Sequence, residues 1–87
     1  MTYTLTFCGS RGGKHVVKNI ECFEHGIPGE IVYIKRDKYG IRRYGVPAHI
    51  VLSIVSDDSV IYEWNRNAKT PAIVNIATSL RSHGLTL

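Results

Sequence analysis

Cysteine is scarce in this sequence, and long apolar runs are absent. The 87 residues include two cysteines, Cys8 and Cys22, whereas a secreted domain of this size usually carries several disulfides. The longest apolar stretch, residues 50–55, is far too short to span a bilayer. The first six residues lack the basic and apolar regions of a signal peptide, and no Asn-x-Ser/Thr site occurs. We therefore expect a cytoplasmic protein with reduced thiols and no membrane partner.

The motifs of nucleotide-dependent enzymes are also missing. The glycine-rich segment 9–14 resembles a P-loop only in its final Gly-Lys, because the pattern needs glycine in place of Cys8 and serine or threonine in place of His15. The dinucleotide pattern G-x-G-x-x-G is absent as well. The segment is either a plain surface loop or, through its backbone N–H groups with Arg11 and Lys14, a cradle for a phosphate.

No pattern of metal ligands or catalytic residues is recognisable. Two cysteines and two histidines follow one another as C-x6-H-x6-C-x2-H, which matches no usual spacing of zinc ligands. The adjacent acids Asp57 and Asp58 lie among turn-forming residues. One small core leaves little room for a pocket that excludes water. We therefore expect no enzymatic activity, no cofactor and no metal.

The residues that are present favour one folded domain with a moderate positive charge. Hydrophobic residues make up 44% of the chain and charged residues 21%, which is ordinary for a globular domain, and the length allows a single domain over residues 1–87. Lys and Arg number 11 against 7 Asp and Glu, giving a net charge of +4. That excess suits nucleic acid, a nucleotide or an acidic protein surface, although solubility alone also requires a charge of this size.

Alternating and β-branched segments predict several strands. Residues 2–8 alternate between threonine and larger apolar side chains, which is the pattern of a half-buried strand. Composition and turn signals predict further strands at 30–36, 41–46, 48–55 and 60–64.

Segment 14–25 allows two interpretations. Its apolar residues Val16, Ile20 and Phe23 recur at i, i+4 and i+7, which favours a helix that ends at Gly26. The β-branched pair at 16–17 and the turn-favouring Asn19 leave a bulged strand open. We favour the helix.

The C-terminal region carries the clearest local signal. Thr70 is expected to cap a helix, Pro71 to occupy its first position and Gly84 to follow its end. The predicted apolar stripe of this helix consists of Ile73, Ile76, Ala77 and Leu80. Strands followed by a helix predict an α+β fold, with an antiparallel sheet and a C-terminal helix packed on one face.

The densest charge lies in a predicted hairpin. Five of the 11 basic residues fall between positions 35 and 43: Lys35, Arg36, Lys38, Arg42 and Arg43. A four-residue turn over 37–40 would pair Lys35 with Arg42 and Tyr33 with Tyr44. These four side chains then share one face, which we expect to meet solvent. The opposite face, with Val32, Ile34 and Ile41, is expected to join the core.

We interpret the tyrosine-bearing face as a ligand surface. Like charges opposite each other destabilise a sheet, and a bound anion would remove that penalty. Aromatic rings can stack on bases, and cations bind phosphates. The expected ligand-binding residues are Tyr33, Lys35, Lys38, Arg42, Arg43 and Tyr44, with Arg11 and Lys14 added if the glycine-rich loop also binds anions. The alternative is that these basic residues only protect an exposed sheet edge from aggregation.

Two other functions remain open. In the first, the chain is a protein-binding inhibitor or adaptor whose basic face, or Trp64 with Arg66, docks on an acidic partner surface. Small chains with few motifs resemble accessory proteins of mobile elements that block a host enzyme or defence complex. In the second, the chain is a sheet-edge homodimer without a polyanion ligand. Under the polyanion hypothesis, the ligand is DNA, RNA or a small phosphorylated molecule.

Overall fold

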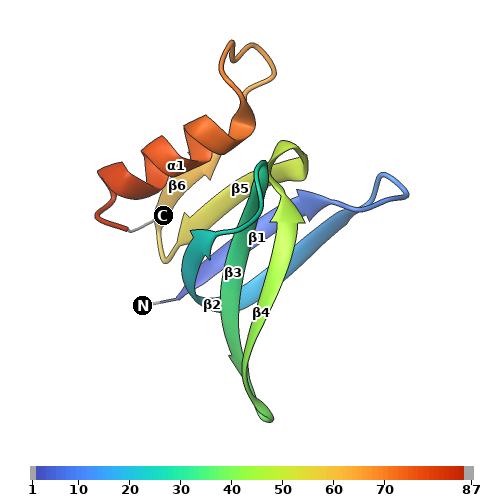
Figure 1. Ribbon diagram of the computed structural model, residues 1–87, viewed down its shortest axis with the longest axis vertical. Coiled ribbons are helices and arrows are strands. Elements are labelled where there is room, and N and C mark those ends of the chain that lie inside the picture. Colours follow the sequence, from blue (N-terminus) through green and yellow to red (C-terminus); the bar gives the residue numbers. More distant parts are fainter. Residues whose placement is uncertain (1, 86–87) are drawn as a thin grey trace.

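A six-stranded antiparallel sheet forms most of the protein (Figure 1). The computed structural model describes residues 2–85. The strands are β1 (Tyr3–Cys8), β2 (Lys14–His25), β3 (Glu30–Asp37), β4 (Gly40–Pro47), β5 (Val51–Ser56) and β6 (Ser59–Glu63), with a 3-10 turn η1 (Ala48–Ile50) before β5 and a helix α1 (Ala72–Ser82) at the end. The predicted α+β fold with a C-terminal helix is confirmed.

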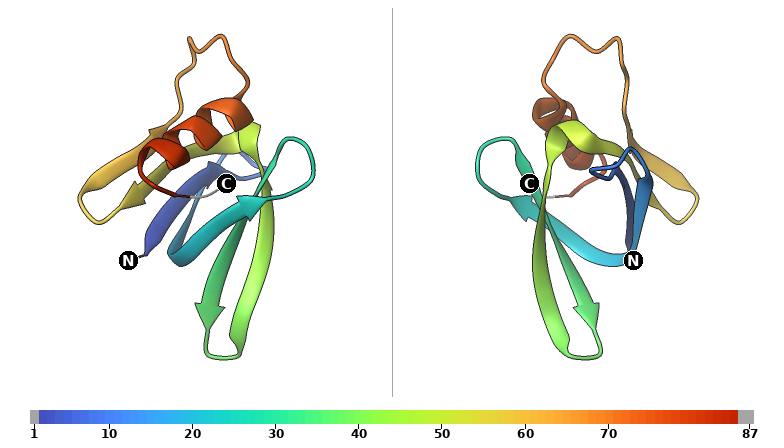
Figure 2. Two further views of the ribbon diagram at one scale, coloured as in Figure 1. Left: turned by 60° about the vertical axis from the view of Figure 1, so that its left-hand side comes forward. Right: turned by 90° about the vertical axis from the view of Figure 1, so that its right-hand side faces the viewer.

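The order of the strands across the sheet is β4-β3-β2-β1-β5-β6. The first four strands form a meander, and η1 then turns the chain back so that β5 pairs with β1. The strand expected over 48–55 therefore begins only at Val51. Strands β4 and β6 are the two edges. The β3–β4 hairpin projects from the end of the molecule opposite α1 (Figure 2).

Strand β2 occupies the segment for which we favoured a helix, so that prediction is wrong. The bulged-strand alternative is the correct one, because the register shifts against β1 and again, between Ile20 and Cys22, against β3. Asn19 adopts a left-handed backbone with φ of 62°, which asparagine tolerates better than most residues. Since a bulge adds one residue to a strand, Ile20 and Phe23 lie three positions apart and still face the same core.

The hydrophobic core lies between one face of the sheet and α1. Its largest fully buried side chains are Leu5, Ile20, Ile31, Val51, Ile54, Ile76 and Leu80. Removing such a side chain from water contributes roughly 1.5–3 kcal/mol to folding. The core therefore rests on the centre of the sheet and on the helix.

Helix α1 ends as expected but begins differently. Pro71 lies at the N-cap, and the Thr70 hydroxyl donates to the side-chain oxygen of Asn75 instead of capping the helix. Gly84, with φ of +79°, follows the last turn as predicted. The stripe residues Ile76, Ala77 and Leu80 are buried. Within residues 2–85, no helix has the length and apolar character needed to cross a bilayer.

Candidate functional site

The β3–β4 hairpin has the register predicted from its turn. Lys35 lies opposite Arg42, and Tyr33 lies opposite Tyr44. Asp37 accepts the backbone N–H of Tyr39 at 2.7 Å, which is the usual role of aspartate in a turn. Local turn chemistry therefore determines which side chains of the hairpin share a face.

The face of the hairpin that we expected to meet solvent is the more buried one, and the face that we expected to join the core is the more exposed one. We call the face with Tyr33 and Tyr44 the inner face, because it continues the buried face of the sheet. Tyr33 is 8% exposed, whereas Ile41 on the outer face is 57% exposed. The prediction that the face of Val32, Ile34 and Ile41 joins the core is therefore wrong. Both faces carry apolar residues, and the pairing of β3 with β2, which sets Tyr33 beside buried Phe23, decides between them.

Carboxylates balance the basic residues of the outer face. Arg36 donates from Nε to Glu21 at 2.9 Å, and Arg43 donates to Glu24. A third carboxylate, that of Glu30, packs over Gly45. The outer face thus carries three glutamates against two guanidinium groups. Arg43, which we expected to help bind the ligand, lies on this balanced face.

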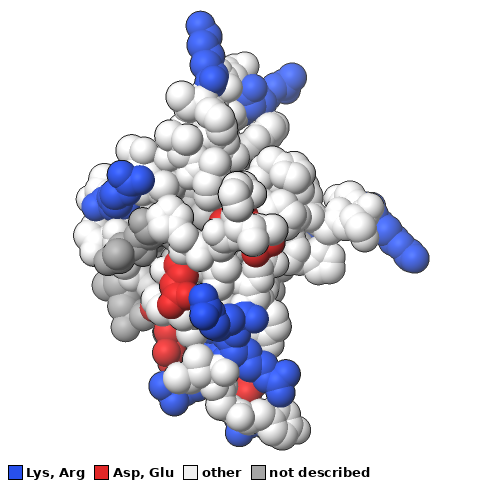
Figure 3. Space-filling model, viewed as in Figure 1, with Lys and Arg blue, Asp and Glu red and all other residues white. Residues whose placement is uncertain are grey.

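Basic side chains gather over the projecting hairpin, and acidic side chains lie among them in the view of Figure 3. On the inner face, the residues toward the turn are mainly basic. Lys35 and Arg42 lie side by side, and the nearest acid, Asp37, is 3.4 Å from Arg42 Nε. Among residues 2–85, Lys35 and Lys38 form no ion pair. We call this surface the hairpin patch; it consists of Lys35, Lys38, Tyr39, Arg42 and Tyr44.

Tyr39 belongs to the patch although we did not predict it. Its side chain is 74% exposed at the turn, with Lys38 Nζ 5.1 Å and Arg42 Cζ 6.0 Å from the centre of its ring. Both distances allow a cation–π interaction. The sequence signal was available, since an aromatic residue next to Lys38 occupies the predicted turn. Tyr33, in contrast, is too buried to contact a ligand directly.

Stability is expected to fall as the pH rises above about 10. Burial, together with nearby Tyr44, raises the pKa of Tyr33, and burial raises the pKa of Tyr62. Above that pH the unfolded chain loses protons that the folded chain keeps, so ionisation favours unfolding; below it both states are neutral at these residues. Urea unfolding at about pH 8 and about pH 11 measures the loss. A double variant, Tyr33→Phe with Tyr62→Phe, should lose less stability than Tyr39→Phe over this range, and equal losses would contradict the assignment.

The glycine-rich loop lies apart from the hairpin patch. It connects β1 to β2 and projects sideways, far from the turn of the hairpin (Figure 1). Arg11 and Lys14 therefore do not join the patch. Within the loop, the N–H of Gly9 donates to the carbonyl of Gly13 at 2.6 Å, and the N–H of Gly12 donates to the carbonyl of Gly9. These two groups are thus engaged within the loop and do not face a ligand.

No protein-family model, curated protein or solved structure matches this chain. Its function must therefore be inferred from what its surfaces can bind.

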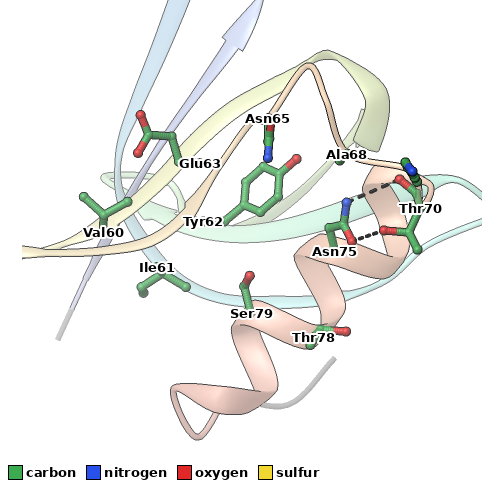
Figure 4. A pocket seen from close by; sticks show the side chains of 11 residues that line it. Val60, Ile61, Tyr62, Glu63, Asn65, Ala68, Thr70, Asn75, Thr78 and Ser79 are labelled. Carbon is green, nitrogen blue, oxygen red and sulfur yellow. Dashed lines mark hydrogen bonds between the residues drawn. The ribbon is translucent and has the colours of Figure 1, made fainter.

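A second surface lies at the opposite end of the molecule, between edge strand β6 and α1. Here the residues form an open, polar hollow of about 470 Å³ (Figure 4). The Tyr62 ring is buried beside it, and none of the side-chain hydrogen bonds within residues 2–85 involves the Tyr62 hydroxyl. Trp64 and Arg66, the residues of our alternative protein interface, line a neighbouring hollow of about 130 Å³.

The cysteines and histidines do not assemble into a reactive site. Cys8 is half-buried, Cys22 is exposed, and both are free. Partial burial, followed by the charges of Glu24 and Glu21, raises the pKa of Cys22, which keeps the less reactive thiol form at neutral pH. Within residues 2–85, no three His, Cys, Asp or Glu side chains are arranged to hold a metal ion.

Proposed function

We propose that this chain is a non-enzymatic binding protein that holds a polyanion on its hairpin patch. The observation that supports the proposal most directly is the pairing of Lys35 with Arg42 on the face without glutamates. Two cations in directly opposite positions destabilise a sheet. A phosphate between them would turn this repulsion into two attractive contacts.

The surroundings of Arg42 suit phosphate binding. Asp37 lies near its Nε atom, and the same carboxylate is held in the turn through the N–H of Tyr39. The Arg42 side chain is 56% exposed, so its guanidinium can reach a ligand. A guanidinium presents two parallel donors, which match the geometry of a phosphate. Lys35, opposite Arg42 in β3, and Lys38, in the turn, add two further positive charges.

Binding is expected to weaken steeply with salt and to depend on the inner face. With three phosphate contacts, the logarithm of the association constant should fall by roughly 2 per tenfold rise in salt for a single strand. Arg42→Glu should abolish retention, whereas Arg43→Glu, with the same change of charge on the outer face, should retain most of it. Anisotropy of a labelled oligonucleotide, with inorganic polyphosphate as competitor, from about 50 to about 200 mM salt measures both effects.

The same experiment separates the alternatives. Equal losses in the two variants would mean that only net charge matters and would overturn the assignment to the hairpin patch. If the purified chain binds neither probe but retains one protein from a lysate after nuclease treatment, the protein-binding alternative replaces the proposal. A dimer in sedimentation, without binding of either probe, would instead favour the sheet-edge homodimer.

A further inference from the structure

The ring of Tyr44 offers a platform on which another flat group can stack. One side of the ring packs against Tyr33, and the other side lies at the edge of the sheet. Tyr33 stacks on it with ring centres 5.3 Å apart and an angle of 21° between the planes. Tyr33 is itself held in the core beside Phe23, whose ring packs against that of Tyr3 at 5.6 Å. Tyr44 is 40% exposed. Because β4 is an edge strand, no strand among residues 2–85 pairs with it on the side away from β3 and Tyr33.

Stacking on buried Tyr33 restricts the conformations of the Tyr44 ring before a ligand arrives. The cost of ordering it is met by folding, so a flat group that stacks on it gains more affinity than on a mobile side chain. Through Tyr33, the exposed ring of Tyr44 is thus packed against the hydrophobic core, and it lies next to the cations of the hairpin patch.

Aromatic and basic side chains alternate from this ring toward the turn. Arg42 lies two residues from Tyr44 on the same face, roughly 7 Å away along the strand. Tyr39 follows at the turn, with the Arg42 guanidinium 6.0 Å from its ring. Each nucleotide of an unpaired strand likewise offers a flat base and, one sugar away, a phosphate. Alternating rings and cations are the usual means of binding such strands without reading their sequence.

On the basis of the function proposed above, we infer that the polyanion is a single-stranded nucleic acid with one base stacked on Tyr44. A duplex offers its phosphates but keeps its bases stacked on one another, so the platform would stay empty. A lone nucleotide fills the platform but supplies phosphate at one end only. An unpaired strand occupies the platform and the cations together.

The test compares ligands of equal charge that differ in their bases. Oligonucleotides of about ten residues, one of thymidine and one abasic throughout, are titrated against the chain, with a duplex and thymidine monophosphate alongside. The thymidine strand should bind about 5- to 150-fold tighter than the abasic strand, which is the effect of one stacked base. Tyr44→Leu should remove this advantage, so that the variant binds the thymidine and abasic strands equally.

Two further variants keep the result interpretable. Tyr44→Phe retains the ring and should retain the preference for bases, even if Tyr44→Leu proves less stable. Trp64→Leu removes an exposed aromatic at the other end of the molecule and should change nothing.

The possible failures are distinct. Equal binding of the thymidine and abasic strands overturns the stacking inference and leaves the polyanion proposal standing. A duplex that binds as tightly as the single strand, at equal charge, overturns the inference in the same way. No binding of any of the four ligands overturns the inference and the proposed function together.

Discussion

Replacing Leu5 with alanine is expected to lower the free energy of unfolding by about 3–5 kcal/mol. Leu5 is fully buried in β1, between Val17 of β2 and Ile54 of β5. Strands pair with β1 on both sides, so the backbone there has little freedom to collapse into the cavity. A small domain has a total stability of only about 5–15 kcal/mol, so this single substitution should remove a large part of it. Urea unfolding followed by circular dichroism measures the change.

Thr6→Ala provides the matched control for this substitution. Thr6 is the next residue of the same strand, it points to the other face, and it is only half-buried. Its replacement should cost less than about 1 kcal/mol. If the two variants lose the same stability, Leu5 is not at the centre of the core and the burial described above is wrong.

The register of the hairpin could be predicted because local chemistry determines it. Asp37 and Gly40 define the turn, and strict alternation then fixes each partner across the two strands. The pairing of Lys35 with Arg42 therefore followed from a nine-residue stretch without knowledge of the rest of the fold. The C-terminal helix is a similar case, since its apolar stripe and Gly84 lie within one segment.

The exposure of the two faces depends on contacts that are distant in sequence. Val32 and Ile34 are as apolar as Ile31, so the hairpin alone does not reveal which face is buried. The decision comes from β2, where Phe23 enters the core and Glu21 and Glu24 reach the arginines of the outer face. Because we interpreted β2 as a helix, its pairing with β3 could not be used to predict which face of the hairpin is buried. The bulges in β2 had turned a strand pattern into helix-like spacing.

The candidate site was therefore only partly predictable. Lys35, Lys38, Arg42 and Tyr44 lie together as expected, because they follow from the register. Tyr33 was assigned to the ligand and instead supports the ring of Tyr44 from inside the protein. Two aromatic residues that share one face of a hairpin can therefore differ in burial: here Tyr33 lies in the core and Tyr44 lies at the surface.

A double variant, Lys35→Gln with Arg42→Gln, is expected to weaken binding of a single strand roughly 70-fold at about 50 mM salt. The estimate follows from the loss of two phosphate contacts, each of which contributes a salt-dependent factor of roughly 8 under these conditions. Stability should change by less than about 1 kcal/mol, because Arg42 is exposed and glutamine keeps part of the half-buried aliphatic stem of Lys35. Removing the repulsion between them favours folding, and losing the exposed Arg42–Asp37 pair opposes it.

The double variant Arg36→Gln with Arg43→Gln removes the same charge from the outer face and serves as the control. It breaks the ion pairs with Glu21 and Glu24, so its stability should fall slightly while its binding changes little. The inner-face variant should therefore lose affinity and keep its stability, whereas the outer-face variant should keep its affinity and lose a little stability. Misfolding would produce parallel losses in stability and binding. If both variants bind equally well, the basic residues of the hairpin serve solubility and protection of the β4 edge, not ligand binding.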